Sequence, residues 1–203
     1  MEDTSNISAV VLAGGLSRRL GRDKAFEPIG NLPLIQRVLS QVSQISRHTI
    51  VVANDKKRET QLSGLDGISI SIDKYPDTGS LGGIFTGIHA STTDWTFVVA
   101  CDMPFLNIKL IRYIMSLKEG YDAVVPVIDG RPEPIHSIYS KDCLEHIEEK
   151  ITNNELKITG FFDKISVRYV NESAINEFDP DHLSFLNVNN EEDLEKAINI
   201  ANR

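Results

Sequence analysis

Residues 10–25 of the chain (VVLAGGLSRRLGRDKA) combine residue types that suit the binding of phosphate groups. Two adjacent glycines, Gly14 and Gly15, follow an apolar run, and glycine lets backbone N–H groups approach a ligand without obstruction by a Cβ atom. The cations that come next can neutralise a polyphosphate: Arg18, Arg19, Arg22 and Lys24. The stretch matches neither the P-loop pattern nor the dinucleotide pattern GxGxxG. A tight turn with a solvated basic surface is therefore an alternative at this point.

An aspartate in the middle of the chain is a candidate magnesium ligand. Asp102 directly follows Trp95–Cys101 (WTFVVAC), the most apolar strand candidate in the sequence. Mg²⁺ is commonly held by one or two carboxylates together with substrate phosphates, so one well-placed aspartate is sufficient. Asp73, which follows the strand candidate Ile68–Ile72, is a weaker candidate of the same kind. An aspartate that caps a helix or closes a turn is the alternative for both.

Other catalytic chemistries find little support in the sequence. The five histidines show no close metal-ligand spacing such as HExxH, and we expect them on the surface or hydrogen-bonded to neighbours. Cys101 lies at the end of an apolar strand candidate, where packing explains a cysteine better than nucleophilic catalysis does. The GxSxG motif of the α/β-hydrolases is absent.

The hydrophobic pattern predicts an α/β scaffold for these residues. Short β-branched runs alternate with segments of helical spacing, which indicates βαβ units and a mostly parallel central sheet with helices on both faces. Residues 129–139 (DGRPEPIHSIY) are predicted to form a loop followed by a strand, for which an antiparallel orientation is considered. The other predicted strands cover residues 7–12, 49–53, 68–72, 95–101, 123–127 and 184–188. The main predicted helices cover residues 34–45, 108–117, 191–200 and a stretch from residue 84.

The predicted strand ends define where a ligand should bind. In open α/β sheets, ligands bind beyond the carboxyl ends of the strands. The glycine-led stretch follows the first predicted strand, and polar residues follow four others: Asn54, Asp55, Asp73, Asp102 and Asn189. We therefore expect these side chains at one edge of the sheet, as a site for phosphates and a divalent metal.

Length and composition limit the class of protein. The chain has 203 residues, of which 41% are hydrophobic and 25% charged, and we expect residues 1–203 to form one domain. A formal net charge of -8 argues against general binding to nucleic acid or to an anionic membrane. The apolar runs fall short of the roughly 20 residues that a membrane helix needs, and residues 1–8 lack the order of a signal peptide. With two cysteines and no CxxC motif, we expect a reduced, cytoplasmic protein.

Four segments together resemble the molybdenum cofactor guanylyltransferases, within a wider group of nucleotidyltransferases that share a Rossmann-like sheet. Leu12–Ala25 (LAGGLSRRLGRDKA) resembles the family's opening signature without a gap, and Pro33–Val42 (PLIQRVLSQV) resembles its first helix. Ala100–Leu106 (ACDMPFL) is similar to its metal-aspartate segment, and Phe185–Leu194 (FLNVNNEEDL) is similar to a late segment. These matches follow the family's order along the chain. The sequence departs from the family at Ser80, where proline is usual.

The resemblance implies a fold, an activity and a cofactor. The implied fold is a three-layer, Rossmann-like α/β fold of the nucleotide-diphospho-sugar transferase type, in a single nucleotidyltransferase domain. The implied reaction transfers GMP from GTP to the terminal phosphate of molybdopterin and releases pyrophosphate, with Mg²⁺ as cofactor. The catalytic residues carried over by the motifs are Arg19, Lys24 and Asp102, and Asp102 is the implied metal ligand.

The resemblance also implies binding residues and partners. The implied GTP-binding residues are Leu12, Ala13, Gly14, Gly15, Lys24, Asn54, Asp73 and Asp102. Asn187 and Asn189 are implied on the pterin side, and either is a candidate for a further metal or phosphate contact. The implied partners are GTP and molybdopterin or molybdenum cofactor, with transient contacts to molybdenum cofactor biosynthesis proteins or acceptor molybdoenzymes. Neither nucleic acid nor a membrane is expected as a partner.

Two other functions are kept as alternatives. A related nucleotidyltransferase that uses CTP or another phosphorylated acceptor has the same kind of opening loop. A non-catalytic nucleotide-binding protein with a degenerate site is a second alternative, although the presence of both Lys24 and Asp102 argues against it. A Rossmann oxidoreductase is disfavoured because GxGxxG is absent.

Overall fold

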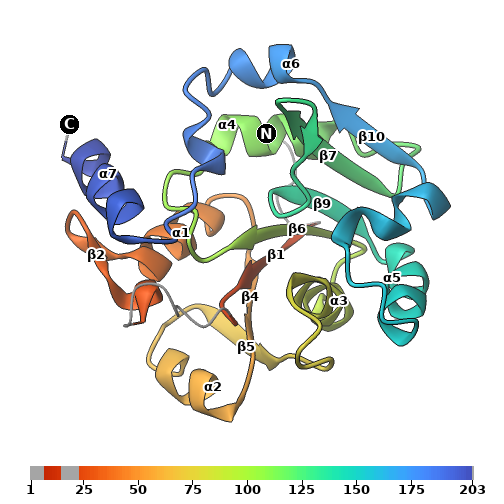
Figure 1. The fold of residues 1–203 in the computed structure, drawn as a ribbon, viewed down its shortest axis with the longest axis horizontal. Helices are drawn as coiled ribbons and strands as arrows, with labels where there is room; N and C mark the ends of the chain where they lie inside the picture. The colour runs from red at the N-terminus through yellow and green to blue at the C-terminus, as the bar shows by residue number, and fades with distance from the viewer. Residues whose placement is uncertain (1–6, 15–22, 203) are drawn as a thin grey trace.

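A mixed β-sheet lies at the centre of the molecule (Figure 1). The computed structural model describes residues 7–14 and 23–202. Within this part of the chain, the strands of the sheet are β1 (Ile7–Leu12), β4 (His48–Ala53), β5 (Ile68–Ile72), β6 (Trp95–Ala100), β7 (Ala123–Ile128), β8 (Arg131–Pro132), β9 (Ser137–Ser140) and β10 (Val167–Val170). They lie in the order β10-β7-β9-β6-β1-β4-β5, with β8 paired to β7.

Four neighbouring strands run in the same direction and end at the same edge. β1 pairs with β4 and with β6, and β4 pairs with β5, all in parallel. Leu12, near the end of β1, lies opposite Val52 of β4 and Ala100 of β6. β9 is antiparallel to both β6 and β7, whereas β10 is parallel to β7. The prediction of a mostly parallel α/β sheet is confirmed, including an antiparallel strand after residues 129–135.

Helices cover both faces of this sheet, which gives three layers (Figure 1). They are α1 (Leu34–Val42), α2 (Lys56–Leu62), α3 (Ser80–Ala90), α4 (Ile108–Ser116), α5 (Cys143–Thr152), α6 (Glu172–Asn176) and α7 (Glu191–Ala201). Successive residues of a strand point to opposite faces. Val10 accordingly belongs to the core beneath α3 and α5, while Ala9 and Val11 belong to the core beneath α1 and α4.

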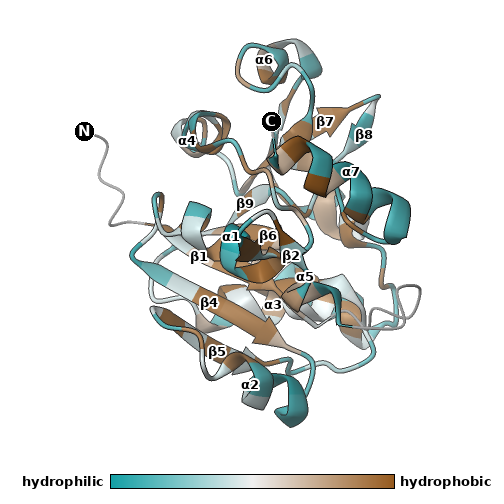
Figure 2. Ribbon diagram, turned by 90° about the vertical axis from the view of Figure 1, so that its left-hand side faces the viewer, coloured by the Kyte–Doolittle hydropathy of each residue, from teal (hydrophilic) through white to brown (hydrophobic). Residues whose placement is uncertain are grey.

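Hydrophobic residues are concentrated in the central layer of the molecule, between the helices (Figure 2). Figure 2 shows hydrophobic residues along the central strands and mainly hydrophilic residues on α2. A smaller third cluster, which includes Ile29, Leu34 and Leu194, joins α7 to the hairpin of β2 (Pro28–Ile29) and β3 (Leu32–Pro33). Within the described ranges, no helix combines the length and the apolar character that a membrane crossing requires.

α3 lies very close to β1, and glycine permits this approach. A Cβ atom at Gly87 would lie 2.4 Å from Cγ1 and 2.7 Å from Cγ2 of Val10. Such distances are not tolerated between carbon atoms, so a larger residue would push the helix away from the strand. The close packing places the first turn of α3 beside the end of β1, where a Cβ atom at Gly83 would lie 3.1 Å from Cδ2 of Leu12.

Three predicted elements differ from the structure, and one of them is the helix predicted over residues 34–45, which ends at Val42. Residues 184–188 do not form a strand; they begin within the short 3-10 helix η4 (Leu183–Phe185) and continue irregularly. The N–H groups of Leu183 and Ser184 donate to the Asp179 carboxylate, and that of Val188 donates to the carbonyl of Asp102 (2.9 Å). These donors are therefore satisfied away from the sheet, and the segment crosses the ends of the strands. The helix predicted from residue 84 begins one turn earlier, at Ser80.

His136 contradicts the expectation of an exposed or hydrogen-bonded histidine. Its side chain is fully buried, with ring centroids 5.3 Å from Phe97 and 4.7 Å from Phe185. Neither ring nitrogen has a hydrogen-bond partner among the described residues. Burial lowers the pKa of His136 to about 4, so the ring is neutral at physiological pH.

Candidate active site

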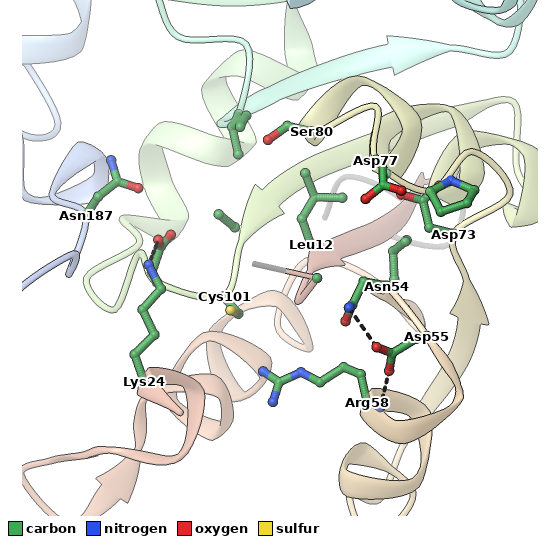
Figure 3. A pocket seen from close by; sticks show the side chains of 18 residues that line it. Leu12, Lys24, Asn54, Asp55, Arg58, Asp73, Asp77, Ser80, Cys101 and Asn187 are labelled. Carbon is green, nitrogen blue, oxygen red and sulfur yellow. Dashed lines mark hydrogen bonds and ion pairs between the residues drawn. The ribbon is translucent and has the colours of Figure 1, made fainter. Parts of the chain in front are cut away.

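A pocket of about 690 Å³ opens at the edge where the parallel strands end. Eight of the residues that the sequence places at the expected site line it: Leu12, Gly14, Lys24, Asn54, Asp55, Asp73, Asp102 and Asn187. Figure 3 shows Lys24 and Asn187 on one side and Asn54 and Asp73 on the other, with Leu12 between them. Segments that are far apart in the sequence thus contribute to one site.

The backbone after β1 passes close to the end of β4. The N–H of Ala13 donates to the carbonyl of Val52 (2.9 Å), which continues the pairing of the two strands. A Cβ atom at Gly14 would lie 3.3 Å from Cβ and 3.4 Å from the backbone N of Asn54, which is tighter than most real contacts. Glycine therefore suits this position because the two segments nearly touch. Four residues of the predicted phosphate loop lie outside the described residues: Gly15, Arg18, Arg19 and Arg22.

Lys24 connects three segments of the site. It is the first residue of the 3-10 helix η2 (Lys24–Phe26), and its Nζ atom lies 2.5 Å from Oδ2 of Asp102. The same ammonium donates to the carbonyl of Val188 (3.1 Å) and to Oδ1 of Asn189 (3.2 Å). Only 13% of the Lys24 side chain and 14% of the Asp102 side chain are exposed, so water screens their attraction weakly.

Asp102 has a free coordination position suited to a metal. It lies two residues beyond the end of β6, and its Oδ1 atom is buried without a hydrogen-bond partner among the described residues. It does not cap α4, because that role belongs to Asn107, whose side chain accepts the N–H groups of Lys109 and Leu110. No group of three or more His, Cys, Asp or Glu side chains in the described ranges could hold a metal. A single carboxylate with a buried, unpaired oxygen fits a Mg²⁺ ion whose other ligands are substrate phosphates and water.

Asp73 is fixed in place on the opposite side of the pocket. Its Oδ1 atom accepts the N–H of Tyr75 (3.0 Å) and the hydroxyl of Thr86 in α3 (2.9 Å). Burial raises the pKa of Asp73, and the two hydrogen bonds partly oppose that effect. Asp73 therefore stabilises the turn that follows β5, as considered from the sequence, and it also lines the pocket.

Asn54 is oriented by its neighbour in the sequence. Its Nδ2 atom donates to Oδ2 of Asp55 (3.0 Å), and Oδ1 of Asp55 caps α2 by accepting the N–H of Arg58 (2.7 Å). Because the amide N–H₂ of Asn54 faces Asp55, the amide oxygen is the acceptor that Asn54 can offer a ligand. Two acceptors of different character, a carboxylate and an amide, thus stand on this side of the pocket.

The two asparagines of the late segment occupy different environments. Asn187 lines the pocket, and its Nδ2 atom donates to the carbonyl of Phe185 (3.1 Å). Asn189 does not belong to the pocket lining; it accepts a hydrogen bond from Lys24, and its own N–H donates to Asp193 in α7 (2.9 Å). The segment reaches Lys24 and Asp102 because residues 184–188 run across the strand ends instead of joining the sheet.

Sequence reasoning missed two charged residues that line the pocket, Arg58 and Asp77. Asp77 has a positive φ of 67° in the turn before α3, and Figure 3 shows it on the same side of the pocket as Asp73. Arg58 and Leu62 lie four positions apart in α2, and both are buried. That spacing places Arg58 on the same, inner face of the helix as Leu62. The spacing is therefore the sequence signal that could have identified Arg58 as a buried residue.

Cys101 is not suited to nucleophilic catalysis. It was expected at the end of a strand, but β6 ends at Ala100 and Cys101 lies in the turn that follows. Burial raises the pKa of its thiol to about 12, so the reactive thiolate is disfavoured at neutral pH. Packing is the better explanation for this residue, as the sequence indicated.

The chain is similar in sequence to a known family and to named proteins. Residues 9–164 match the model of the MobA-like NTP transferase domain. A probable molybdenum cofactor guanylyltransferase of Pelotomaculum thermopropionicum is 34% identical over 194 residues, which cover 94% of this chain and 91% of the relative. A molybdenum cofactor guanylyltransferase of Desulfosudis oleivorans is also 34% identical over 194 residues, with 94% of each chain covered.

Solved structures show the same fold. The molybdopterin-guanine dinucleotide biosynthesis protein A of Archaeoglobus fulgidus superposes with a TM-score of 0.85 at 28% identity, over 96% of this chain and 98% of that one. The 4-diphosphocytidyl-2C-methyl-D-erythritol synthase of Anaerococcus prevotii superposes with a TM-score of 0.68 at 16% identity, over 99% of this chain and 100% of that one. The second likeness concerns the fold alone.

Proposed function

The chain belongs to the MobA-like NTP transferase family and, within it, to the molybdenum cofactor guanylyltransferases, and on this premise we propose the reaction that it catalyses. The protein transfers GMP from GTP to the terminal phosphate of molybdopterin and releases pyrophosphate. The observation that carries this proposal is the convergence of the ends of β1, β4, β5 and β6 on one pocket. That pocket offers a lysine on one side, hydrogen-bond acceptors on the other, and the backbone of Gly14 beside Asn54 (Figure 3).

The reaction requires the protein mainly to position the two substrates and to neutralise their negative charge. The attacking group is a phosphate oxygen that is already an anion, so a histidine or serine is not required to activate it. A bond forms between this oxygen and the α-phosphorus of GTP. The bond between that phosphorus and the oxygen leading to the β-phosphate breaks, and pyrophosphate leaves with the electron pair. Two anions have to approach each other, so fixed positive charge and alignment lower the barrier.

Lys24, Arg19 and the backbone N–H groups of Gly14 and Gly15 are proposed to supply that positive charge, since the N–H of Ala13 already donates to the carbonyl of Val52. Lys24 stands at the phosphate side of the pocket, where its ammonium now neutralises Asp102. An incoming triphosphate offers this ammonium a second anionic partner. Arg19 lies outside the described residues, and its role is carried by the sequence motif alone.

Asp102 is proposed to hold Mg²⁺ through the oxygen that has no protein partner among the described residues. When bound, the ion would supply positive charge to the phosphates of GTP. Two contacts hold Asp102 in place for this role. Its backbone carbonyl accepts the N–H of Val188 (2.9 Å), and Lys24 neutralises Oδ2 of its carboxylate. Asn187 and Asn189, which come from the same late segment, are proposed on the side of the pterin and its phosphate.

Asp73 and Asn54 are proposed to recognise guanine. Guanine presents adjacent N1–H and N2–H donors, which a carboxylate or an amide oxygen can accept. Asp73 is pinned by Tyr75 and Thr86, and Asn54 by Asp55, so both acceptors are fixed before the base arrives. The backbone at Leu12 and Ala13 is proposed to lie beside the base.

The proposal extends to the setting of the reaction. Residues 1–203 are proposed to act as one nucleotidyltransferase domain, in the cytoplasm, where GTP is available. Cys101 and Cys143 are buried free thiols, which suits a reducing compartment. Molybdenum cofactor biosynthesis proteins or acceptor molybdoenzymes are proposed as transient partners that deliver the substrate or receive the product.

The test is direct identification of the product. The protein is incubated with GTP, MgCl₂ and molybdopterin, and the mixture is examined by mass spectrometry while pyrophosphate is measured in parallel. We expect a guanine dinucleotide of molybdopterin and an equal amount of pyrophosphate, with neither formed when molybdopterin is omitted. Release of pyrophosphate without a dinucleotide would contradict the proposed transfer.

A further inference from the structure

Arg58 is a buried cation in the pocket wall to which the proposed reaction assigns no role. It lies in α2, and only 8% of its side chain is exposed. In Figure 3 the side chain extends from the helix toward the side of the pocket that carries Lys24. Burying a guanidinium is costly unless each of its donors finds a partner, so its contacts show what it holds in place.

The guanidinium contacts both ends of the glycine-led stretch. Its Nε atom donates to the carbonyl of Ala13 (2.9 Å), just after β1. Its Nη1 atom forms an ion pair with Oδ2 of Asp23, just before η2, and donates to Oε1 of Gln61 (3.3 Å). The ring of Phe26 packs against the guanidinium, with its centroid 5.3 Å from Cζ. One side chain thus ties together two backbone segments that flank the phosphate-binding candidates.

The contact with Ala13 sets the direction of a backbone donor. In a trans peptide unit, the C=O and the following N–H point in opposite directions. Because Arg58 holds the carbonyl of Ala13, it also fixes the N–H of Gly14 to point away from the guanidinium. Gly14 lines the pocket, so this amide is one of the groups proposed to meet phosphate.

The contact with Asp23 sets the position of Lys24. Oδ1 of Asp23 accepts the N–H of Ala25 (3.2 Å) and caps η2, while Oδ2 pairs with Arg58. Lys24 is the first residue of that short helix, and its ammonium reaches Asp102. A chain of fixed contacts therefore runs from Arg58 through Asp23 to the lysine.

We propose that Arg58 is a positioning residue that shapes the phosphate-binding half of the pocket, and this rests on the proposed function of the pocket as a GTP site. It orients the Gly14 amide and the Lys24 helix without touching the nucleotide. A lysine cannot replace it, because a single ammonium lacks the planar fork that reaches Ala13 and Asp23 together. The role is one of geometry, so the positive charge alone does not fulfil it.

The test separates phosphate binding from base binding. Titration calorimetry measures the affinity of inorganic triphosphate and of guanosine for the wild type, Arg58→Met and Arg58→Lys. We expect both variants to bind triphosphate roughly tenfold or more weakly, with guanosine affinity within about twofold of the wild type. Arg112→Met is a control for the loss of an arginine contact outside the pocket, since the exposed Arg112 also ties two segments, through a hydrogen bond to the carbonyl of Gln44 (3.2 Å), but is absent from the pocket lining.

Asp23→Asn keeps the test decisive if Arg58→Met fails to fold. Asp23 is 32% exposed, and asparagine keeps its size and its capping oxygen, so the fold should survive. We expect the same selective loss of triphosphate affinity, and little further loss when Arg58→Lys is added to Asp23→Asn. Wild-type affinity for triphosphate in Arg58→Lys would overturn the positioning role, and so would equal losses for triphosphate and guanosine. A wild-type protein that binds neither probe would instead overturn the proposed function, and this proposal with it.

Discussion

At the scale of single residues, Lys24 connects the short helix η2 to Asp102, the candidate metal ligand. Its ammonium neutralises Asp102 and also contacts Val188 and Asn189, so it connects two segments that are distant in the sequence. The weakly screened ion pair also fixes the position of the buried Asp102 carboxylate. The predictions at this scale concern Lys24, Asp102 and the buried His136.

Replacing Lys24 should abolish most of the activity while the protein stays folded. Lys24→Ala removes a fixed positive charge from the phosphate side, and losses of this kind typically reach about 10²–10³-fold in kcat. Because Asp102 lines an open pocket, water can replace the lost ammonium, and the circular dichroism spectrum should be unchanged. Steady-state pyrophosphate release checks the prediction. Near-native turnover would remove Lys24 from the mechanism.

Asp102→Asn should uncouple the reaction from Mg²⁺. Asparagine keeps the size of the side chain and can still accept a hydrogen bond from Lys24, but it lacks the charge that a hard cation prefers. We expect turnover to fall by about 10²-fold or more, since phosphate charge is then poorly neutralised. Binding of Mn²⁺, followed by electron paramagnetic resonance, should weaken in parallel. A variant with the wild-type metal dependence would place the metal elsewhere.

His136 should make the fold sensitive to acid. Burial lowers its pKa to about 4, whereas the unfolded chain binds the proton near pH 6.5, so protonation favours unfolding. The stability that depends on the neutral ring is complete above pH 6.5 and is lost as the pH falls toward 4. The loss amounts to about 3 kcal/mol. Urea unfolding of the wild type and His136→Leu at neutral and acid pH measures it, and an equal pH dependence in both proteins would contradict this role.

At the scale of elements, the contact between α3 and β1 controls the position of Asp73 in the pocket. Thr86, one residue before Gly87 in α3, donates its hydroxyl to Asp73. The position of Asp73 therefore depends on how closely the helix approaches the sheet. Gly87 sets that distance, because a Cβ atom there would collide with Val10.

Gly87→Ala tests the importance of this close packing. The added methyl group overfills the contact with Val10, and overpacking of this kind costs about 1–3 kcal/mol. Denaturant unfolding should show the loss of stability, and the KM for GTP should rise because Thr86 and Asp73 move with the helix. Gly64→Ala is the control, since a Cβ atom at Gly64 meets nothing within 4 Å. An unchanged stability would contradict the packing argument.

The sequence was sufficient to predict the elements that the hydrophobic pattern marks clearly. The strands predicted at 7–12, 68–72 and 95–101 are rich in β-branched and other apolar residues, and their limits agree with the structure to within a residue. The pattern failed for residues 184–188, because alternation predicts a strand only when a neighbouring strand is free to pair. It also left β10 unrecognised, since the edge strand Val167–Val170 is short and half of its residues are exposed.

At the scale of the whole molecule, the site is assembled from segments that only the topology brings together. The order of the strands explains why Leu12, Asn54, Asp73 and Asp102 meet, and that much follows from an α/β pattern. The contacts of Lys24 with Asn189 and of Arg58 with Ala13 depend on how loops and helices pack, which hydrophobic periodicity does not encode. The net charge of -8 is compatible with the proposed phosphate site because four cations fall within residues 18–24 of the sequence.

The arrangement of the whole pocket should also make the enzyme selective for guanine. Asp73 and Asn54, which line the pocket, are proposed to accept hydrogen bonds from the adjacent N1–H and N2–H donors of guanine, and cytosine has no such pair. A buried acceptor left unpaired by the wrong base costs about 1–3 kcal/mol, or roughly 5- to 150-fold in selectivity. Asp73→Ala or Asn54→Ala should reduce this preference more than it reduces the maximal rate.

Pyrophosphate release with GTP, CTP, ATP and UTP, each measured with and without molybdopterin, tests the central claim most directly. The wild type should release pyrophosphate with GTP when molybdopterin is present, and kcat/KM for GTP should exceed that for CTP by roughly 5- to 150-fold. Turnover of CTP as fast as GTP with the same acceptor would contradict the assignment as a guanylyltransferase.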